Sequence, residues 1–176
     1  EKYSLNFISN NTTKIIIWSA LEEILKFIGI IVLIYKNSNV DRPIDYPMYF
    51  IAIALGFAAF ENILYLLNPF NIEGTIVGLL TGNMRFLGST LLHAIASSMI
   101  GTSLGLAFYS KKHNGKYLMG GIICAITLHS IFNFFIMRRD GADFLSVFGF
   151  LWVVTIINIL IFEKLKRMGK ILPVTA

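Results

Sequence analysis

Residues 144–162 read FLSVFGFLWVVTIINILIF, nineteen consecutive positions without a charged side chain. At the helical rise of about 1.5 Å per residue, such a segment is about as long as the ~30 Å hydrocarbon core of a bilayer is thick. Comparable apolar stretches precede it at 14–35, 48–67, 81–109 and 117–137. Because backbone groups in lipid must be satisfied within each segment, the sequence predicts an all-α, polytopic transmembrane helical bundle of about five spans. We expect residues 1–176 to form a single domain.

The composition agrees with a membrane protein. The 176 residues are 56% hydrophobic and 14% charged, whereas soluble domains average about 45–50% apolar and about 25% charged residues. The net charge of +5 comes from basic residues in the short connections, which indicates contact with anionic lipid headgroups and no nucleic-acid partner. The single cysteine, Cys124, excludes an intrachain disulfide and a cysteine-based metal cage. We expect no cofactor.

The positions of Lys and Arg near the span ends predict the orientation. One side of the membrane receives nine of them and the other receives five. The nine are Lys36, Arg42, Lys111, Lys112, Lys116, Lys164, Lys166, Arg167 and Lys170. Since the more basic side faces the cytoplasm, we expect a multi-pass protein of the cell membrane with a cytoplasmic C-terminus. The sequence begins at Glu1 without an initiator Met, which leaves open whether a further helix precedes it.

Polar side chains occur where the predicted spans should meet only lipid. A charge at mid-bilayer is costly and usually faces the bundle interior or a water-filled cavity. At helical rise, the acidic and imidazole side chains lie at a common depth of roughly 9–18 Å from the outer end of each span. Agreement among four spans indicates one site in the outer half of the membrane. The polar residues are Glu22, Glu23 and Lys26, then Glu61 and Asn62, then His93, and finally His129 and Asn133.

Spacing within the helices supports one site. His129 and Asn133 are i and i+4 and therefore share a helix face, as do Glu22 and Lys26, so that Lys26 can neutralise one carboxylate of the Glu22–Glu23 pair. Two adjacent carboxylates in a low dielectric cannot both ionise cheaply, which suits one of them to general-base work. Single glycines at positions 56, 88, 101 and 105 are expected to permit close helix approach.

Other interpretations of these residues stay open. A single intramembrane histidine is more often structural than catalytic, and a Glu–Lys pair within one helix is commonly a neutralised structural pair. Two histidines with glutamates also form a zinc-ligand set, although an H-E-x-x-H motif is absent. Buried Glu and His residues also relay protons in transporters, but no inverted repeat is visible. A non-catalytic membrane receptor or immunity protein is a further alternative.

Four short motifs resemble those of one family, the PrsW membrane proteases. EEILK at 22–26 resembles its E-E-x-x-K motif, and FAAFEN at 57–62 resembles F-A-x-x-E-N. Arg85 is followed eight residues later by His93 and eight more by Gly101, and HSIFN at 129–133 resembles the final H-x-x-x-N. The order along the chain is also that of the family. This family is similar to the CAAX prenyl endopeptidases and bacteriocin-related membrane proteases.

The resemblance implies an intramembrane endopeptidase with a glutamate-activated water. We expect no metal, because the two imidazoles come from different spans and no ligand pair has a familiar zinc spacing. Glu22, paired with Glu23, would activate the water, and His93 or His129 would position that water or protonate the leaving amine. Asn133 would donate to the oxyanion. The supporting residues would be Lys26, Asn62 and Arg85, with Glu61 sharing the water. The substrate would be a membrane-anchored protein, such as an anti-sigma factor, cut near its outer membrane boundary in a site-1-type cleavage.

Overall fold

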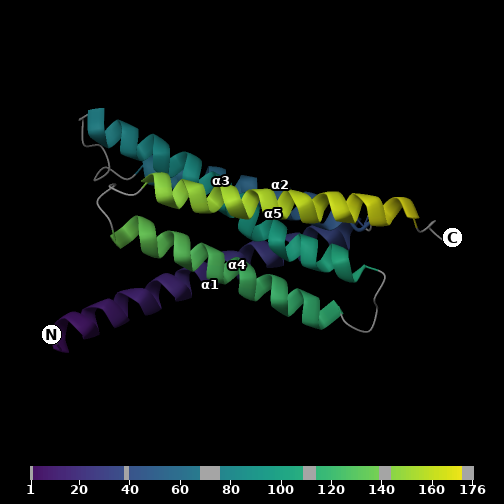
Figure 1. Cartoon of the computed structure of the whole chain (residues 1–176), viewed down its shortest axis with the longest axis horizontal. Helices are drawn as coiled ribbons and strands as arrows, with labels where there is room; N and C mark the ends of the chain where they lie inside the picture. The colour runs from purple at the N-terminus through teal and green to yellow at the C-terminus, as the bar shows by residue number, and fades with distance from the viewer. Residues whose placement is uncertain (1, 38–39, 68–75, 109–113, 139–143, 172–176) are drawn as a thin grey trace.

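The computed structural model describes residues 2–37, 40–67, 76–108, 114–138 and 144–171 (Figure 1). Within them every regular element is an α-helix, so the predicted all-α class is confirmed. Each helix contains or closely overlaps one predicted span. The helices are α1 (Lys2–Asn37), α2 (Asp45–Leu66), α3 (Ile76–Ala107), α4 (Asn114–Arg138) and α5 (Phe144–Ile171).

Four of these helices are long and apolar enough to cross a membrane, namely α2, α3, α4 and α5. Helix α1 has ample length, with 36 residues, but Glu22, Glu23 and Lys26 stand in its centre. Because of these three charges, α1 is not apolar enough to be assigned as a membrane span from its composition alone. Glu23 and Lys26 are nonetheless buried against other helices, so they impose no charge on the lipid-facing surface of α1.

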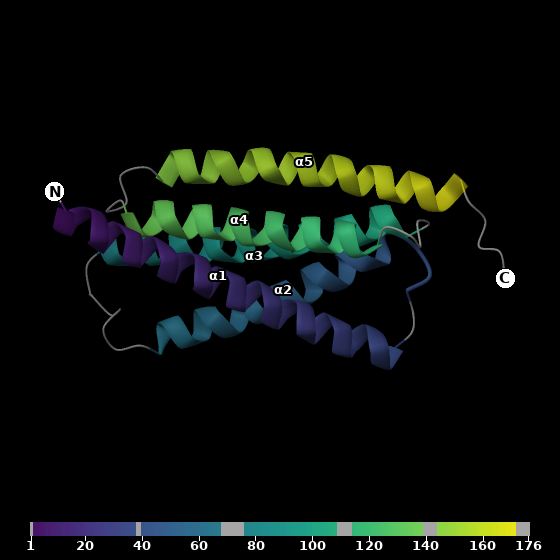
Figure 2. The same ribbon diagram turned by 90° about the horizontal axis from the view of Figure 1, so that it is seen from below.

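Helix α3 occupies the centre of the bundle and packs against all four other helices. In Figure 2, α3, α4 and α5 run roughly alongside one another, whereas α1 and α2 cross at an angle. Helix α1 begins at one end of the long axis and α5 ends at the other (Figure 1). A chain of five helices that alternate in direction begins and ends at opposite ends of the bundle, as the five predicted spans require.

Small residues set the distance between α3 and its neighbours. A Cβ added to Gly101 would lie 2.5 Å from Cα of Pro47 on α2, so only glycine permits this approach. Gly121 on α4 meets the α3 backbone in a similar way, since an added Cβ would lie 2.9 Å from Cα of Ile100. The expectation for Gly56 was wrong, because no atom of another helix among the described residues lies within 4 Å of a Cβ built there.

The distribution of side chains is that of a membrane protein, with apolar groups outside and polar groups inside. Trp152 is 57% exposed and Leu160 66% exposed on α5, a surface suited to contact with lipid. An apolar core between the helices includes Phe50, Leu92 and Ile100. Next to this core lies a set of buried polar residues that includes Ser19, Glu23, Lys26, Asn62, His93, Ser97, Ser98, Thr102 and His129.

Candidate active site

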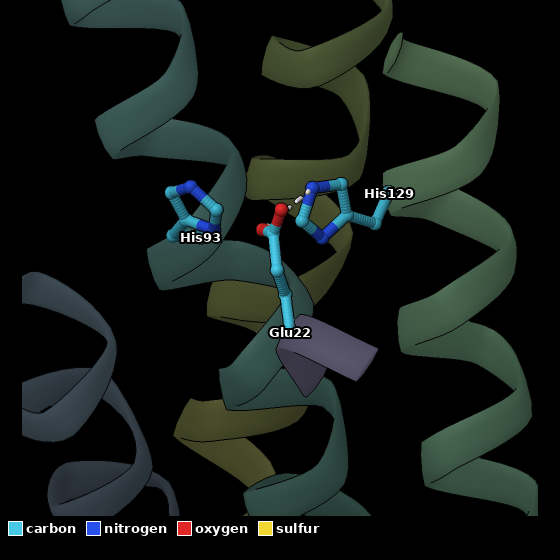
Figure 3. A group of neighbouring side chains, drawn as sticks. All are labelled: Glu22, His93 and His129. Carbon is cyan, nitrogen blue, oxygen red and sulfur yellow. Dashed lines mark ion pairs between the residues drawn. The ribbon is translucent and has the colours of Figure 1, made fainter. Parts of the chain in front are cut away.

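Side chains from four helices meet between α1, α2, α3 and α4. Helix α1 contributes the charged residues Glu22, Glu23 and Lys26, while α2, α3 and α4 contribute the titratable residues Glu61, His93 and His129. Figure 3 shows the carboxylate of Glu22 pointing between the two imidazoles. The imidazoles meet edge to face, with ring centroids 5.0 Å apart. The structure thus brings together residues separated by more than one hundred positions in the sequence.

Glu23 is the most completely bonded member of the cluster. Its side chain is fully buried. Its Oε1 accepts hydrogen bonds from Lys26 Nζ at 2.6 Å and from Nδ1 of His129 at 2.8 Å. Its Oε2 accepts one from Ser97 Oγ at 3.2 Å. Donors from three helices therefore hold this carboxylate in place, and it has little capacity left for a water molecule.

The contact with Glu23 fixes the tautomer of His129. A carboxylate only accepts hydrogen bonds, so the proton of the neutral imidazole lies on Nδ1. The lone pair then lies on Nε2, which faces Oε2 of Glu22 at 3.4 Å. That oxygen is buried and accepts no hydrogen bond from the described residues. Two electron-rich atoms thus face each other, an arrangement suited to a shared proton or a metal cation between them, or to a water molecule beside them.

His93 is held by two partners. Nζ of Lys26 lies 2.7 Å from its Nδ1, and an ammonium group can only donate. Nε2 therefore carries the ring proton and donates it to Oε2 of Glu61 at 2.6 Å. Phe57 covers both groups, because Lys26 Nζ lies 4.8 Å from the centroid of its ring and His93 meets the ring edge to face. This apolar cover strengthens the polar contacts beneath it.

Exposure distinguishes the carboxylates from one another. The side chain of Glu22 is 21% exposed and that of Glu61 is 39% exposed, whereas Glu23, His93 and His129 are at most 2% exposed. The cluster therefore has an open side, formed by carboxylates of α1 and α2, and a closed side that contains the imidazoles and Glu23. Glu22 borders both sides.

The remaining predicted residues lie around this cluster. Asn133 donates to Ser19 Oγ on α1 at 3.4 Å, and Asn62 donates to Thr90 Oγ1 on α3 at 3.2 Å. Both amides therefore bridge neighbouring helices in this structure. Lys26 neutralises Glu23, its i−3 neighbour, although the i,i+4 spacing also favoured Glu22. The side chain of Arg85 lies outside the described residues.

Sequence reasoning missed two contributors, Ser97 and Phe57. Ser97 is four residues from His93 on α3 and so shares its helix face, a spacing that could have indicated its position. Its neighbour Ser98 has the same chemistry but donates to the carbonyl of Ile95 within its own helix. Helical spacing distinguishes the two serines only once it is known that the face of α3 that carries His93 points toward the cluster.

The donor atoms also fit a metal ion by type. Ligand atoms of Glu22, His93 and His129 lie within 4.8 Å of one another, and two imidazoles with one carboxylate form a common zinc-ligand set. Glu23 orients His129 as an outer carboxylate orients a metal-bound histidine. His93 differs, because both of its nitrogens are engaged. It could offer one to a metal only after exchanging Lys26 or Glu61.

Comparisons with known proteins agree on one family. The family described as "PrsW family intramembrane metalloprotease" matches residues 3–161. Protease PrsW of Shouchella clausii is 26% identical over 152 residues, covering 86% of this chain and 67% of that protein. Protease PrsW of Halalkalibacterium halodurans is 27% identical over 165 residues (92% and 73%), and that of Bacillus subtilis is 31% identical over 135 residues (75% and 58%).

The curated relatives are longer than this chain. The chain spans 50% of the length of Protease PrsW of Geobacillus kaustophilus and up to 73% of the others named here. No solved structure matches the chain.

Proposed function

Because the chain belongs to the PrsW family of intramembrane proteases, we propose that it is a membrane endopeptidase that cleaves a membrane-anchored protein at the Glu–His cluster. The family supports a peptidase over a transporter or a non-catalytic receptor, and the four helices that are long and apolar enough to cross a membrane agree with an intramembrane site. The observation that carries the proposal is the position of Glu22, a carboxylate with one unbonded buried oxygen facing the lone pair of His129.

Glu22 is the better general base of the adjacent pair. Three donors occupy Glu23, and its side chain is closed to solvent. Glu22 has the exposure that a water molecule and a peptide need, and Oε2 has capacity to accept a proton. A general base must lie within hydrogen-bond reach of the proton it removes. The carboxylate of Glu22 and Nε2 of His129 together provide two acceptors for the two hydrogens of one water.

The chemical step follows from these two acceptors. Glu22 takes one proton as the water oxygen forms a bond to the scissile carbonyl carbon, and His129 keeps the water oriented through the other hydrogen. The tetrahedral intermediate then collapses, the carbon–nitrogen bond breaks, and the proton held by Glu22 passes to the leaving amine. The amide of Asn133, which now donates to Ser19, is our candidate donor to the oxyanion.

Glu61 lies on the open side of the site, and the buried His93 holds it there. His93 donates from Nε2 to Glu61, and its Nδ1 accepts a hydrogen bond from Lys26. Because both nitrogens are occupied, His93 does not bind the water that Glu22 holds. We assign to this pair the alignment of the substrate backbone near Glu22. Asn62 fixes α2 against α3 through Thr90 and so supports the position of Glu61 one residue away.

A metal-dependent reaction is the second candidate, because the name of the matching family and the donor set both favour it. Glu22, His93 and His129 would hold the ion, and a bound zinc would supply a Lewis acid that polarises the scissile carbonyl. Binding the ion would require His93 to exchange Lys26 or Glu61. The roles of Glu23 and Lys26 toward each other and toward His129 would stay the same. Glu23 still fixes the tautomer of His129, and Lys26 still neutralises Glu23.

The nine-to-five distribution of basic residues supports a cytoplasmic C-terminus and a site in the outer half of the bilayer. We therefore propose that the substrate is a single-span protein cut at or just outside its outer membrane boundary, as in site-1 cleavage of an anti-sigma factor. The test compares membrane proteins from cells that express the wild-type chain or Glu22→Gln by mass spectrometry. A fragment that ends at a new outer-boundary terminus only with the wild type is expected.

The matched control in these cells is Glu163→Gln. Glu163 is an exposed α5 residue that pairs with Arg167 at 3.3 Å, so its substitution removes the same charge away from the cluster. Identical fragment patterns from wild type and Glu22→Gln would contradict the assignment of Glu22.

A further inference from the structure

Ser97 is a fully buried serine on α3 that the proposed reaction leaves unassigned. Its Oγ donates to Oε2 of Glu23 at 3.2 Å, across the gap between α3 and α1. A serine in a helix usually finds an acceptor in the preceding turn of its own backbone, as Ser98 and Thr102 do here. Ser97 instead bonds the carboxylate that orients His129.

This serine has no features of a nucleophile. Its hydrogen-bond partner is a carboxylate, and activation of a serine requires a base, usually a histidine, within reach of its proton. The nitrogens of His129 face Glu22 and Glu23, and those of His93 face Lys26 and Glu61. Neither imidazole is directed at Ser97.

The two carboxylate oxygens of Glu23 have different donors, and this difference indicates how Ser97 affects the orientation of the carboxylate. Oε1 accepts from Lys26 and His129, while Ser97 is the donor that the described residues direct to Oε2. A carboxylate bonded at one oxygen can turn about its last side-chain bond, whereas one bonded at both is held in a single plane. Loss of the Ser97 hydroxyl would leave a buried oxygen without its donor and free the carboxylate to turn.

We propose that Ser97 is a positioning residue that acts on the reaction through Glu23. By fixing the plane of that carboxylate, it keeps Oε1 opposite Nδ1 of His129 and so keeps the lone pair of Nε2 directed at the water held by Glu22. The proposal rests on the proposed peptidase function. It requires no contact between Ser97 and the substrate.

The first test measures cleavage kinetics of Ser97→Ala in detergent micelles, with a substrate identified by the mass-spectrometric comparison. Removal of the outer partners of a metal-bound imidazole typically reduces activity about 10- to 100-fold, and we take the lower end of this range for a serine that acts on His129 through Glu23. We expect kcat to fall about tenfold with little change in KM, because the substrate does not touch this residue. Ser98→Ala is the matched control, since Ser98 is an adjacent buried serine that bonds Ile95 and contacts Asn158.

The second test reads the tautomer of His129 and does not depend on turnover. Nitrogen-15 NMR of histidine-labelled protein, with His113 replaced by Gln, should show one Nδ1-protonated ring for His129 in the wild type and in Ser98→Ala. Ser97→Ala should show a mixture of tautomers. An unchanged His129 signal, or a kcat within twofold of Ser98→Ala, would overturn the role of Ser97. Failure of the peptidase proposal is distinguishable, because wild type and Glu22→Gln would then cleave at equal rates.

Discussion

Substitution of the two adjacent glutamates should separate stability from catalysis. Glu23 is fully buried and bonded to Lys26, which is itself 1% exposed. Glu23→Gln removes the charge opposite this ammonium. Breaking a buried ion pair from one side costs about 3–5 kcal/mol, because the remaining charge stays buried without compensation. Glu22 is 21% exposed, and its buried oxygen accepts no hydrogen bond from any residue that the structure describes, so Glu22→Gln should change stability by less than about 1 kcal/mol.

The assay is reversible unfolding by SDS in mixed micelles, followed by circular dichroism. Glu163→Gln on the exposed face of α5 supplies the baseline for loss of one carboxylate. Glu23→Gln should unfold at clearly lower SDS, and Glu23→Gln combined with Lys26→Met should recover part of the loss, since no buried charge is then left alone. If Glu22→Gln destabilised the protein as much as Glu23→Gln, the division of roles between them would be refuted.

Three further predictions test other parts of the account. Cleavage should survive chelation, and purified active protein should lack stoichiometric metal; about one zinc per chain, removed with loss of activity and restored with it, would establish the metal-dependent candidate instead. With Cys124 replaced by Ala, an impermeant thiol reagent on intact cells should label Asn71→Cys and spare Asn114→Cys, and the reverse pattern would place the site in the cytoplasmic half. Gly101→Ala should cost about 1–3 kcal/mol by overpacking against Pro47, whereas Gly56→Ala should be close to neutral in the same SDS titration.

Much of the fold could be predicted because the membrane imposes a simple length rule. Charge-free stretches such as 144–162 correspond directly to helices, and a polar residue within such a stretch has to face the bundle interior. The shared depth of Glu22, His93 and His129 could therefore be predicted from their positions along the spans. Helix α1 shows that apolar composition alone does not identify every span, because the charges that lower its apolar character belong to the buried cluster.

Partner choice could not be predicted, since helical spacing offers several partners and packing selects one. Lys26 lies within reach of residues at both i−3 and i−4, and in the packed bundle it bonds Glu23 and His93 together. The adjacent serines of α3 are equivalent in sequence, and only the direction of α1 shows that Ser97 meets a carboxylate. Gly56 failed as a packing position because no other helix in the described part of the chain comes within 4 Å of a Cβ built there.

The central claim is that Glu22 activates the water that cleaves the peptide bond. Its most direct test is single-turnover cleavage of a membrane-anchored substrate by purified protein, comparing wild type, Glu22→Gln and Glu163→Gln. General-base catalysis contributes about 10²- to 10⁴-fold, so Glu22→Gln should be slower by that factor while Glu163→Gln matches the wild type. Cleavage by a folded Glu22→Gln protein at the wild-type rate would contradict the account.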